Sequence, residues 1–496
     1  MENSKLKNHQ IKVNLTGGIV SVGDLSAILE ILDHAGIQNI SFGTRQQLYF
    51  SANELQLEDI EHSFLISDTD FETDADLHPN IVSSYVAEDL FNSSNWLREG
   101  VYKDILDTFS YAPKLKINLV DDSQTLVPFF SGNLNFISSD IGNYWHLYVR
   151  FPKTNNIYYW SSLVYSEDIG VLSEMIEHTI LSRRDLYYDQ TEADGLQLEA
   201  ALNSSGKFIF QAPSSLLKLP DFQVPYYEGF NKYNDKYWLG IYRRNELFPV
   251  TFLRELCDIC GKSRIGQLYT TPWKSIIIKG VAPADRKLWN IALDKNRINV
   301  RHASNELNWQ TEDLCEEGLQ LKHELIREFN EADVRTFKLC FAIKINPKSG
   351  LFGSIIIRKQ NTTDPANANV LFDLLHTADF NPNSKHYHTY AQGVGKTDLL
   401  PRLIDLCEHY YQSQTLAAGV QTDSYYETGD PAEPEITYVQ QCPHCLSIYD
   451  EAWGDEDSGI PASTPFSELP DAYCCPTCET NLVEFTSIIK ETLHLL

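Results

Sequence analysis

The chain has 496 residues, several times the usual domain length of about 100 to 200, so we expect two or three folded domains. Hydrophobic residues make up 43% and aromatic residues 12% of it, which excludes the class of disordered chains. The net charge of -28 would repel a nucleic-acid backbone and an anionic membrane surface, so we expect neither as a partner.

The distribution of cysteines and the lack of long apolar runs indicate in which compartment the protein is located. No apolar stretch approaches 18 residues, and the N-terminal residues lack the apolar centre of a signal peptide, so we expect a soluble, cytoplasmic protein. None of the ten cysteines precedes Cys257, and five of them fall between Cys442 and Cys478. In a reducing compartment such clustering indicates metal binding rather than disulfides.

Two segments far apart in the chain share one layout. In the first, Ser21 or Asp24 can cap a helix with one apolar face, and the strand-like run ISFGTRQQLYF follows. A shift of 228 places brings a second helical segment and the run LYTTPWKSIII into register. The apolar helical positions are Leu25, Ile28, Leu29 and Leu32 in the first copy and Leu253, Leu256, Cys257 and Cys260 in the second. We expect these two cysteines to pack in the core rather than form a redox pair.

A second pair of strand-like segments recurs at a similar distance. KLKINL begins at Lys114 and KLCFAI begins 224 positions later at Lys338, each after a helical stretch. Alternating helix and strand in two copies predicts a pseudo-symmetric tandem of α+β or α/β type. We place its halves at residues 1–195 and 200–415, a linker rich in Gly, Pro and acidic residues at 416–435, and a small domain at 436–496.

The small domain carries two Cys-Pro-x-Cys motifs. Cys442, Cys445, Cys475 and Cys478 can supply four thiolates in a tetrahedron, which suits zinc or iron. Four protein ligands leave no position for a substrate, so the site is structural with zinc and electron-transferring with iron. Cys474 adjoins the second motif, and we expect it to be a small core residue.

The sequence between the two motifs resembles that of the rubredoxins. The motifs are 30 positions apart, more than the roughly 15 to 20 residues of an ordinary zinc ribbon, which remains the alternative. The matching residues are Tyr449, Asp450, Gly454, Asp455, Gly459, Ile460, Phe466, Leu469, Pro470, Asp471, Tyr473 and Phe485. The resemblance implies one iron that cycles between the ferric and ferrous states. Rubredoxins have Gly after each motif, where this chain has Leu446 and Glu479, which implies an altered reduction potential.

The tandem resembles the paired modules of sirohaem-dependent nitrite and sulfite reductases. The resemblance rests on GTRQQ from Gly43, APKLK from Ala112 and the repeat itself. It implies that Arg45, Lys114 and Lys116 form a cationic pocket for an anion or a tetrapyrrole. Solvated surface charges are the alternative for these three residues.

Other parts of that family's pattern do not recur. Pro79 stands where the family has a further pocket Arg. The positions that align with the four cysteine ligands of its [4Fe–4S] cluster are Trp309, Cys315, Asn346 and Gly350. One ligand of four survives, which argues against a [4Fe–4S] cluster and against sirohaem in this chain.

These features together predict a one-electron carrier for a partner reductase, with the tandem as a degenerate scaffold. The resemblance implies a place in nitrite or sulfite assimilation. Two alternatives stay open: a tetrapyrrole-binding reductase fed by its own rubredoxin, and a zinc-stabilised interaction protein. The sequence does not decide whether the chain is itself an enzyme, and it favours an electron carrier over a self-contained reductase.

Overall fold

The computed structural model describes most of the chain, in two compact units, Met1–Gln414 (unit 1) and Thr415–Leu496 (unit 2). The described residues are 7–91, 96–203, 208–300, 304–346, 349–360, 370–384, 386–422, 438–444, 447–455, 458–470, 472–476 and 480–489. Within these ranges no helix combines the length and the apolar character needed to cross a bilayer.

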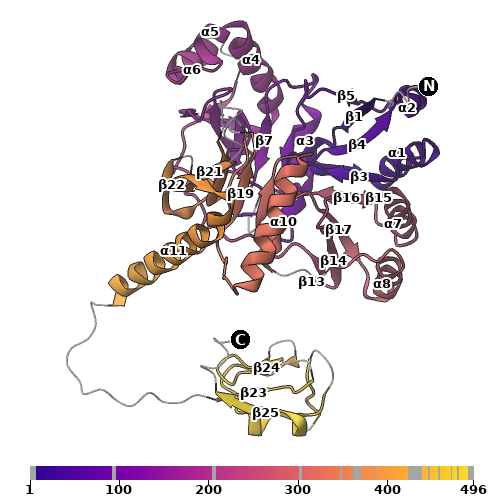
Figure 1. Cartoon of the computed structure of the whole chain (residues 1–496), viewed down its shortest axis with the longest axis vertical. Coiled ribbons are helices and arrows are strands. Elements are labelled where there is room, and N and C mark those ends of the chain that lie inside the picture. The colour runs from indigo at the N-terminus through magenta and orange to yellow at the C-terminus, as the bar shows by residue number, and fades with distance from the viewer. Residues whose placement is uncertain are drawn as a thin grey trace. The chain divides into compact units, whose positions relative to one another are not determined.

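Unit 1 contains two copies of one antiparallel α+β layout, as the sequence repeat predicts. Strands β1, β3 and β4 and helix α1 have counterparts 228 positions later in β14, β16, β17 and α7. The first copy has β1 (Asn8–Val13), α1 (Val22–His34), β3 (Asn39–Phe42), β4 (Leu48–Asn53), α2 (Glu54–Ile66) and β5 (Glu72–Thr73). The second has β13 (Gly229–Tyr233), β14 (Lys236–Ile241), α7 (Val250–Lys262), β16 (Gln267–Thr270), β17 (Ile276–Val281) and α8 (Arg286–Lys295). Helices α1, α2, α7 and α8 lie along one side of the unit (Figure 1).

The two copies exchange a short strand with each other. Strand β2 (Ile19–Ser21) pairs with β16 of the second copy, and β15 (Phe248–Pro249) pairs with β3 of the first. The resulting sheet orders are β15-β3-β4-β1-β5 and β13-β14-β17-β16-β2. The predicted halves therefore share their sheets, and a cut near residues 195–200 would leave each sheet without one edge strand.

Helices α1 and α7 pack against each other at the core of this region. Helix α1 begins where the sequence predicts, because the Ser21 hydroxyl accepts the Asp24 N–H at 2.9 Å. Burial raises the pKa of the Cys257 and Cys260 thiols to about 12, so both belong to the core as expected. The predicted apolar face of each helix is buried: Leu25, Ile28, Leu29 and Leu32 in α1, and Leu253, Leu256, Cys257 and Cys260 in α7.

The loops after β3 and β16 meet at the centre of unit 1. Gln46 and Lys274 are 228 positions apart and both have positive φ, 65° and 55°. The Gln46 amide donates to the Thr270 carbonyl at 2.8 Å, and the Thr270 hydroxyl donates to the Gln46 carbonyl at 2.8 Å. This reciprocal pairing holds the backbone directly after Arg45 in place.

Each half of unit 1 continues into a mixed α/β sheet of common topology. In each half, two parallel pairings are followed by antiparallel ones: the parallel runs are β6-β7-β8 in the first half and β18-β19-β20 in the second. The first half has β6 (Val82–Ser83), α3 (Glu99–Asp107), β7 (Ile117–Val120), β8 (Leu134–Ser138), β9 (Tyr144–Arg150), β10 (Ile157–Tyr159), β11 (Leu163–Tyr165), α4 (Ile169–Ser182), α5 (Arg184–Tyr187), α6 (Gly195–Asn203) and β12 (Phe210–Gln211). The second has α9 (Ser304–Leu307), β18 (Trp309–Thr311), α10 (Glu316–Glu331), β19 (Phe341–Lys344), β20 (Ile355–Lys359), β21 (Leu371–Thr377), β22 (Tyr387–Gly395) and α11 (Leu399–Thr422).

Helix α11 differs from the sequence expectation at its end. The helix continues to Thr422, so the first seven residues of the predicted linker 416–435 are helical. The run Leu416-Ala417-Ala418 consists of strong helix formers, which outweighs the following Gly419. The rest of the predicted linker lies outside the described residues.

Unit 2 is a small three-stranded antiparallel sheet with an aromatic core. The order is β24-β23-β25, with β23 (Tyr438–Gln441), β24 (Ile448–Tyr449) and β25 (Thr486–Ile489). Its buried core residues are Tyr449, Ile460, Leu469 and Tyr473, with Phe466, Leu482 and Phe485 packed against them. The aromatic residues singled out in the sequence thus form the core of this unit.

Candidate functional site

The two cysteine motifs of unit 2 occupy equivalent turns. The first lies between β23 and β24, and the Cys442 N–H donates to the Ser447 carbonyl at 2.8 Å. In the second, the Cys475 N–H donates to the Thr480 carbonyl at 2.8 Å, and Cys474 and Asn481 form a β-bridge. Each turn is therefore closed by the same bond, from its first predicted ligand to the residue five positions later.

The chemistry of the donors fits a metal in these turns. Cys442 and Cys475 are both fully buried, whereas Cys474 is only partly buried. Two buried thiols at matching positions of matching turns are suited to an iron or zinc tetrathiolate. Cys445 and Cys478 lie outside the described residues, as do Leu446 and Glu479, so the complete four-cysteine set remains a prediction.

Aromatic side chains from the sequence between the two motifs pack against one another. The Tyr449 ring contacts the rings of Phe466 and Tyr473 at 5.8 and 5.9 Å between centroids. The Tyr449 hydroxyl donates to the Thr464 carbonyl at 2.7 Å, and the Tyr473 hydroxyl donates to Asp455 at 2.8 Å. Satisfied hydroxyls allow these rings to be buried without an unpaired polar group, which keeps the turns rigid.

The surface of unit 2 is acidic. Residues 436–496 contain one Lys or Arg, Lys490, and ten carboxylates: Asp450, Glu451, Asp455, Glu456, Asp457, Glu468, Asp471, Glu479, Glu484 and Glu491. His444 of the first motif lies 2.9 Å from Glu484, which follows the second motif. The neighbouring Val483 is 95% exposed, so an apolar side chain lies on the surface next to Glu484.

In unit 1, Arg45 is a structural residue rather than a free cation. Its guanidinium donates to the Asn80 carbonyl at 2.7 and 3.1 Å, to the Ile117 carbonyl at 2.9 Å and to the Asn118 amide oxygen at 3.2 Å. Arg45 is 8% exposed, and burial lowers its pKa to about 10. Most of its donors are thus used by the protein itself.

Lys114 and Lys116 line a cavity of about 850 Å³. Lys114 is exposed at its edge, and Lys116 is partly buried. Burial, and then the charges of Arg45 and Arg150, lower the pKa of Lys116 to about 8. Lys116 also borders a second cavity of about 500 Å³, which Arg45 lines. The structure therefore brings the three predicted cations together at the junction of two cavities.

Residues that the sequence did not single out make the larger cavity strongly cationic. Its cationic lining residues are Lys114, Lys116, Arg150, Lys153, Arg184, Lys344 and Arg358. Among the described lining residues the one carboxylate is Asp76, which contacts the Lys12 ammonium at 2.7 Å. Arg358 pairs with Asp373 at 2.9 Å, and the remaining positive charge favours the binding of an anion in this cavity.

Lys344 is buried and Arg150 is partly buried. They stand at the ends of the buried strands β9 and β19, one in each half. Burial lowers the pKa of Arg150, and it lowers the pKa of Lys344 to about 8. The sequence signal that could have identified both residues is a charged residue at the end of a mainly apolar strand, YWHLYVR or FAIK.

The 500 Å³ cavity contains three of the positions aligned with cluster ligands. Cys315, Asn346 and Gly350 line it, whereas Trp309 is buried in the core with its ring stacked 4.2 Å from that of Phe341. The Cys315 sulfur caps α10 by accepting the Gly318 N–H at 3.4 Å. A cluster takes several thiolates and the described lining offers one, so the residues do not fit a [4Fe–4S] group.

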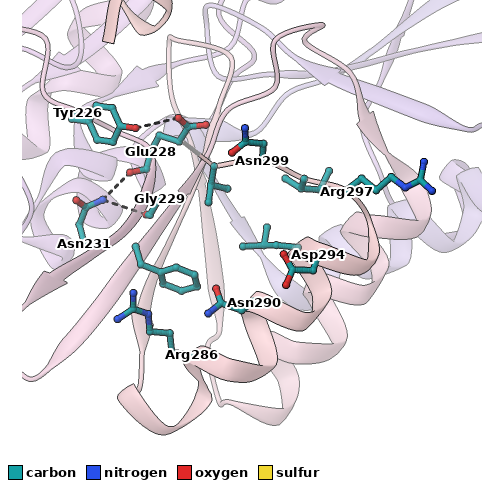
Figure 2. A pocket seen from close by; sticks show the side chains of 13 residues that line it. Tyr226, Glu228, Gly229, Asn231, Arg286, Asn290, Asp294, Arg297 and Asn299 are labelled. Atoms are coloured by element: carbon teal, nitrogen blue, oxygen red, sulfur yellow. Dashed lines mark hydrogen bonds between the residues drawn. The ribbon is translucent and has the colours of Figure 1, made fainter. Parts of the chain in front are cut away.

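A third cavity, of about 820 Å³, lies beside α8 (Figure 2). Arg286, Asn290 and Asp294 project from α8 toward Glu228 and Asn231. Positive and negative side chains both line this cavity, and most of the side chains that project from α8 are exposed. Water can therefore solvate these charges, and no ligand is needed to balance them. This cavity lacks the charge imbalance of the one around Lys116.

Comparison with known proteins agrees with the geometry of unit 2. The Rubredoxin family model matches residues 439–485. Rubredoxin-2 of Chlorobaculum tepidum is 44% identical over 48 residues, which are 10% of this chain and 92% of that protein. Rubredoxin 3 of Rhodococcus erythropolis is 47% identical over 38 residues, which are 8% of this chain and 62% of that protein.

Comparison with solved structures concerns the fold. The structure of the Mycobacterium tuberculosis NirA protein superimposes with a TM-score of 0.59 at 14% identity, covering 85% of this chain and 82% of that one. At this identity the likeness shows the fold alone, and it confirms the predicted nitrite/sulfite reductase-like architecture.

Proposed function

The chain belongs to the rubredoxin family through its C-terminal unit, and from this we propose that it is a one-electron carrier for a partner reductase. In this proposal unit 1 is a scaffold or docking body with a reductase-like fold. Nitrite or sulfite assimilation is the pathway that the fold of unit 1 favours. We place the protein in the cytoplasm, where a reducing environment keeps its cysteines as thiols.

The observation that carries the proposal is the pair of matching turns with buried cysteines. Cys442 and Cys475 start the two turns, and Cys445 and Cys478 complete the proposed ligand set. Iron bound there would supply the couple between its ferric and ferrous states. The buried cysteines and the aromatic core keep water from the turns, which limits rearrangement when the charge changes.

The acidic surface supports a basic partner. Exposed carboxylates of unit 2, such as Glu484 and Glu468, attract a positively charged protein over long distances, and the exposed Val483 offers an apolar contact. Attraction by charge with a small apolar centre suits a transient encounter, which an electron carrier needs in order to turn over.

The first test is the metal content and colour of the full-length protein refolded with ferrous iron under anaerobic conditions. We expect about one iron per chain, a red colour when oxidised and bleaching on reduction, because iron thiolates absorb visible light by charge transfer. Zinc present after ordinary expression does not decide the question, since zinc enters tetrathiolate sites readily. Failure to take up iron on refolding would instead favour a zinc-stabilised interaction protein.

A second function is supported by the cation-lined cavity. Lys116, Arg150 and Lys344 could neutralise the carboxylates of a tetrapyrrole, and unit 2 would then pass electrons to it within one chain. The missing cysteines around Cys315 speak against the multi-electron reduction of nitrite or sulfite. Co-expression with sirohaem synthesis tests this candidate: a tetrapyrrole absorption band and turnover of either anion would establish it.

A further inference from the structure

Two lysines in the wall of the 850 Å³ cavity have similar charge environments but different contacts. The Lys344 ammonium donates to the Ser349 carbonyl at 3.1 Å. For the Lys116 ammonium, no acceptor and no carboxylate within salt-bridge distance occurs among the described residues. Lys116 therefore presents the less restrained amine to the cavity.

The groups around Lys116 are suited to an organic acid. The Arg150 guanidinium donates along one edge to the Gly132 and Ser131 carbonyls, at 3.0 and 3.1 Å. Its remaining N–H donors are available to the cavity. Lys114 lies at the edge of the same cavity. Guanidinium and ammonium groups bind carboxylate or phosphate through charge-assisted hydrogen bonds, so an acid group would be held beside the Lys116 amine.

The protonation of Lys116 permits more than ionic contact. An amine attacks only in its neutral form, and the lowered pKa, about 8, makes that form far more populated near neutral pH than it is in an exposed lysine. A lysine that is desolvated or placed next to other cations is the usual form of an amine nucleophile in proteins.

We propose that this cavity binds a small organic acid that carries an aldehyde or ketone, and that Lys116 forms an imine with it. The Lys116 nitrogen lone pair adds to the carbonyl carbon, and one proton passes from the nitrogen to the carbonyl oxygen. The resulting carbinolamine then loses its hydroxyl group and the remaining N–H proton as water while the carbon–nitrogen double bond forms. The step is a condensation, so it needs neither an oxidant nor a reductant, and it does not involve the metal of unit 2.

The test uses the full-length protein and two probes that differ in their acid group. Pyridoxal 5'-phosphate carries an aldehyde and a phosphate, and glyoxylate carries an aldehyde and a carboxylate. Borohydride reduces any imine to a stable amine, and mass spectrometry of peptides locates it. Pyridoxal, which has no phosphate, is the control for attack without binding.

We expect at least one acidic probe to label Lys116 before any other lysine. Inorganic phosphate should slow this labelling, and pyridoxal should react at least tenfold more slowly than its phosphate. Lys116→Arg keeps the charge and should lower incorporation at least tenfold, while the matched variant Lys287→Arg, on the exposed surface of α8, should change it less than twofold. The rate should be half-maximal near pH 8 rather than near the pKa of an exposed lysine.

Two results would overturn the proposal. One is labelling of Lys116 no faster than that of an exposed lysine such as Lys287 with both acidic probes. The other is labelling of Lys116 that neither phosphate nor the pH below about 9 affects. Both can be read in the unaltered protein, so they do not depend on the folding of a variant, and neither depends on iron.

Discussion

The two units place their functional groups in different ways. In unit 2, Cys442 and Cys475 start two short turns of the same shape, and each turn is closed by neighbours in sequence. In unit 1, the cavity around Lys116 draws Arg150 from β9 and Lys344 from β19, strands of different halves. A site built from short turns can be moved between proteins as a piece, whereas a site built between two sheets depends on the whole fold.

The units also differ in what happens when the ligand is absent. The thiols of unit 2 are small and weakly polar, so their burial is inexpensive without metal. The cations around the larger cavity of unit 1 repel one another, which costs stability until an anion binds. Unit 1 should therefore gain stability when Lys116 is replaced by an uncharged residue, and unit 2 should lose its function when a thiol is removed.

The largest effect is expected for Cys475→Ser. Loss of one thiolate should abolish iron binding and the visible absorption, because a tetrathiolate site has no replacement ligand. Cys474→Ser is the matched control, since Cys474 is a partly buried member of a β-bridge, and it should leave both unchanged. The measurement is iron per chain after refolding with ferrous iron. Loss of iron in Cys474→Ser with retention in Cys475→Ser would reverse the ligand assignment.

The next effect distinguishes Arg45 from Lys116 in unit 1. Arg45→Met should lower the free energy of unfolding by about 2–4 kcal/mol, because the buried Asn80 and Ile117 carbonyls lose their donor. Lys116→Met should instead raise it by about 1–3 kcal/mol at pH 7, because a disfavoured charge is removed. Denaturant unfolding of the full chain measures both. Equal destabilisation by the two variants would mean that Lys116 is also structural.

The same lysine predicts a pH dependence. Its pKa is about 8 in the folded chain, below the ordinary value of 10.5, so the folded state loses this proton first as pH rises. Between about pH 8 and 10.5 the unfolded chain binds more protons, and the free energy of unfolding should rise with pH. The rise should be smaller in Lys116→Met than in the unaltered protein. Identical slopes would contradict the lowered pKa.

A smaller effect tests the turn that supports the metal site. Gly454 has a φ of 67°, and an added Cβ would meet the carbonyl oxygens of Pro461 and Ile460. Gly454→Ala should therefore destabilise unit 2 by about 3 kcal/mol. Gly459 has a φ of 74° with open space around it, so Gly459→Ala should cost only about 1 kcal/mol. Thermal unfolding followed by the colour of the iron site compares them, and equal losses would show that the contact does not matter.

The smallest effect concerns the acidic surface of unit 2. Oxidation of the reduced protein by a cationic cobalt hexaammine complex should slow as salt rises through about 0.15 M, where the Debye length is near 8 Å. Oxidation by anionic ferricyanide should accelerate over the same range, which controls for general salt effects. About a threefold change in opposite directions is expected. Two flat responses would exclude an electrostatic partner surface.

The sequence predicted the two units unequally well. The thiol turns could be predicted because the ligands of each motif are three positions apart and the aromatic residues between them, such as Tyr449 and Phe466, have one recognisable spacing. The fold of unit 1 followed from the 228-residue repeat, but the exchange of β2 and β15 did not, because strands of two or three residues carry no periodicity. Arg150 and Lys344 were missed because only the packing of both halves brings them together.

Arg45 shows a further limit of the sequence. The resemblance placed it in an anion pocket, and it does line a cavity, but its donors serve backbone carbonyls such as that of Asn80. Backbone carbonyls are present at every position, so a sequence does not reveal which of them a buried guanidinium will find. The predicted start of the linker at residue 416 was wrong because the helix formers at 416–418 extend α11 into a stretch otherwise rich in Gly and Pro.

We expect electron transfer in this chain to be confined to unit 2, and a reductive titration can test this. The iron-loaded full-length protein and Cys475→Ser are each titrated with a calibrated reductant under anaerobic conditions while the visible spectrum is recorded. The unaltered protein should take up one electron per chain, coincident with bleaching, and Cys475→Ser should take up none. Uptake of electrons by Cys475→Ser, with a tetrapyrrole or cluster absorption that changes in step, would instead place a redox centre in unit 1.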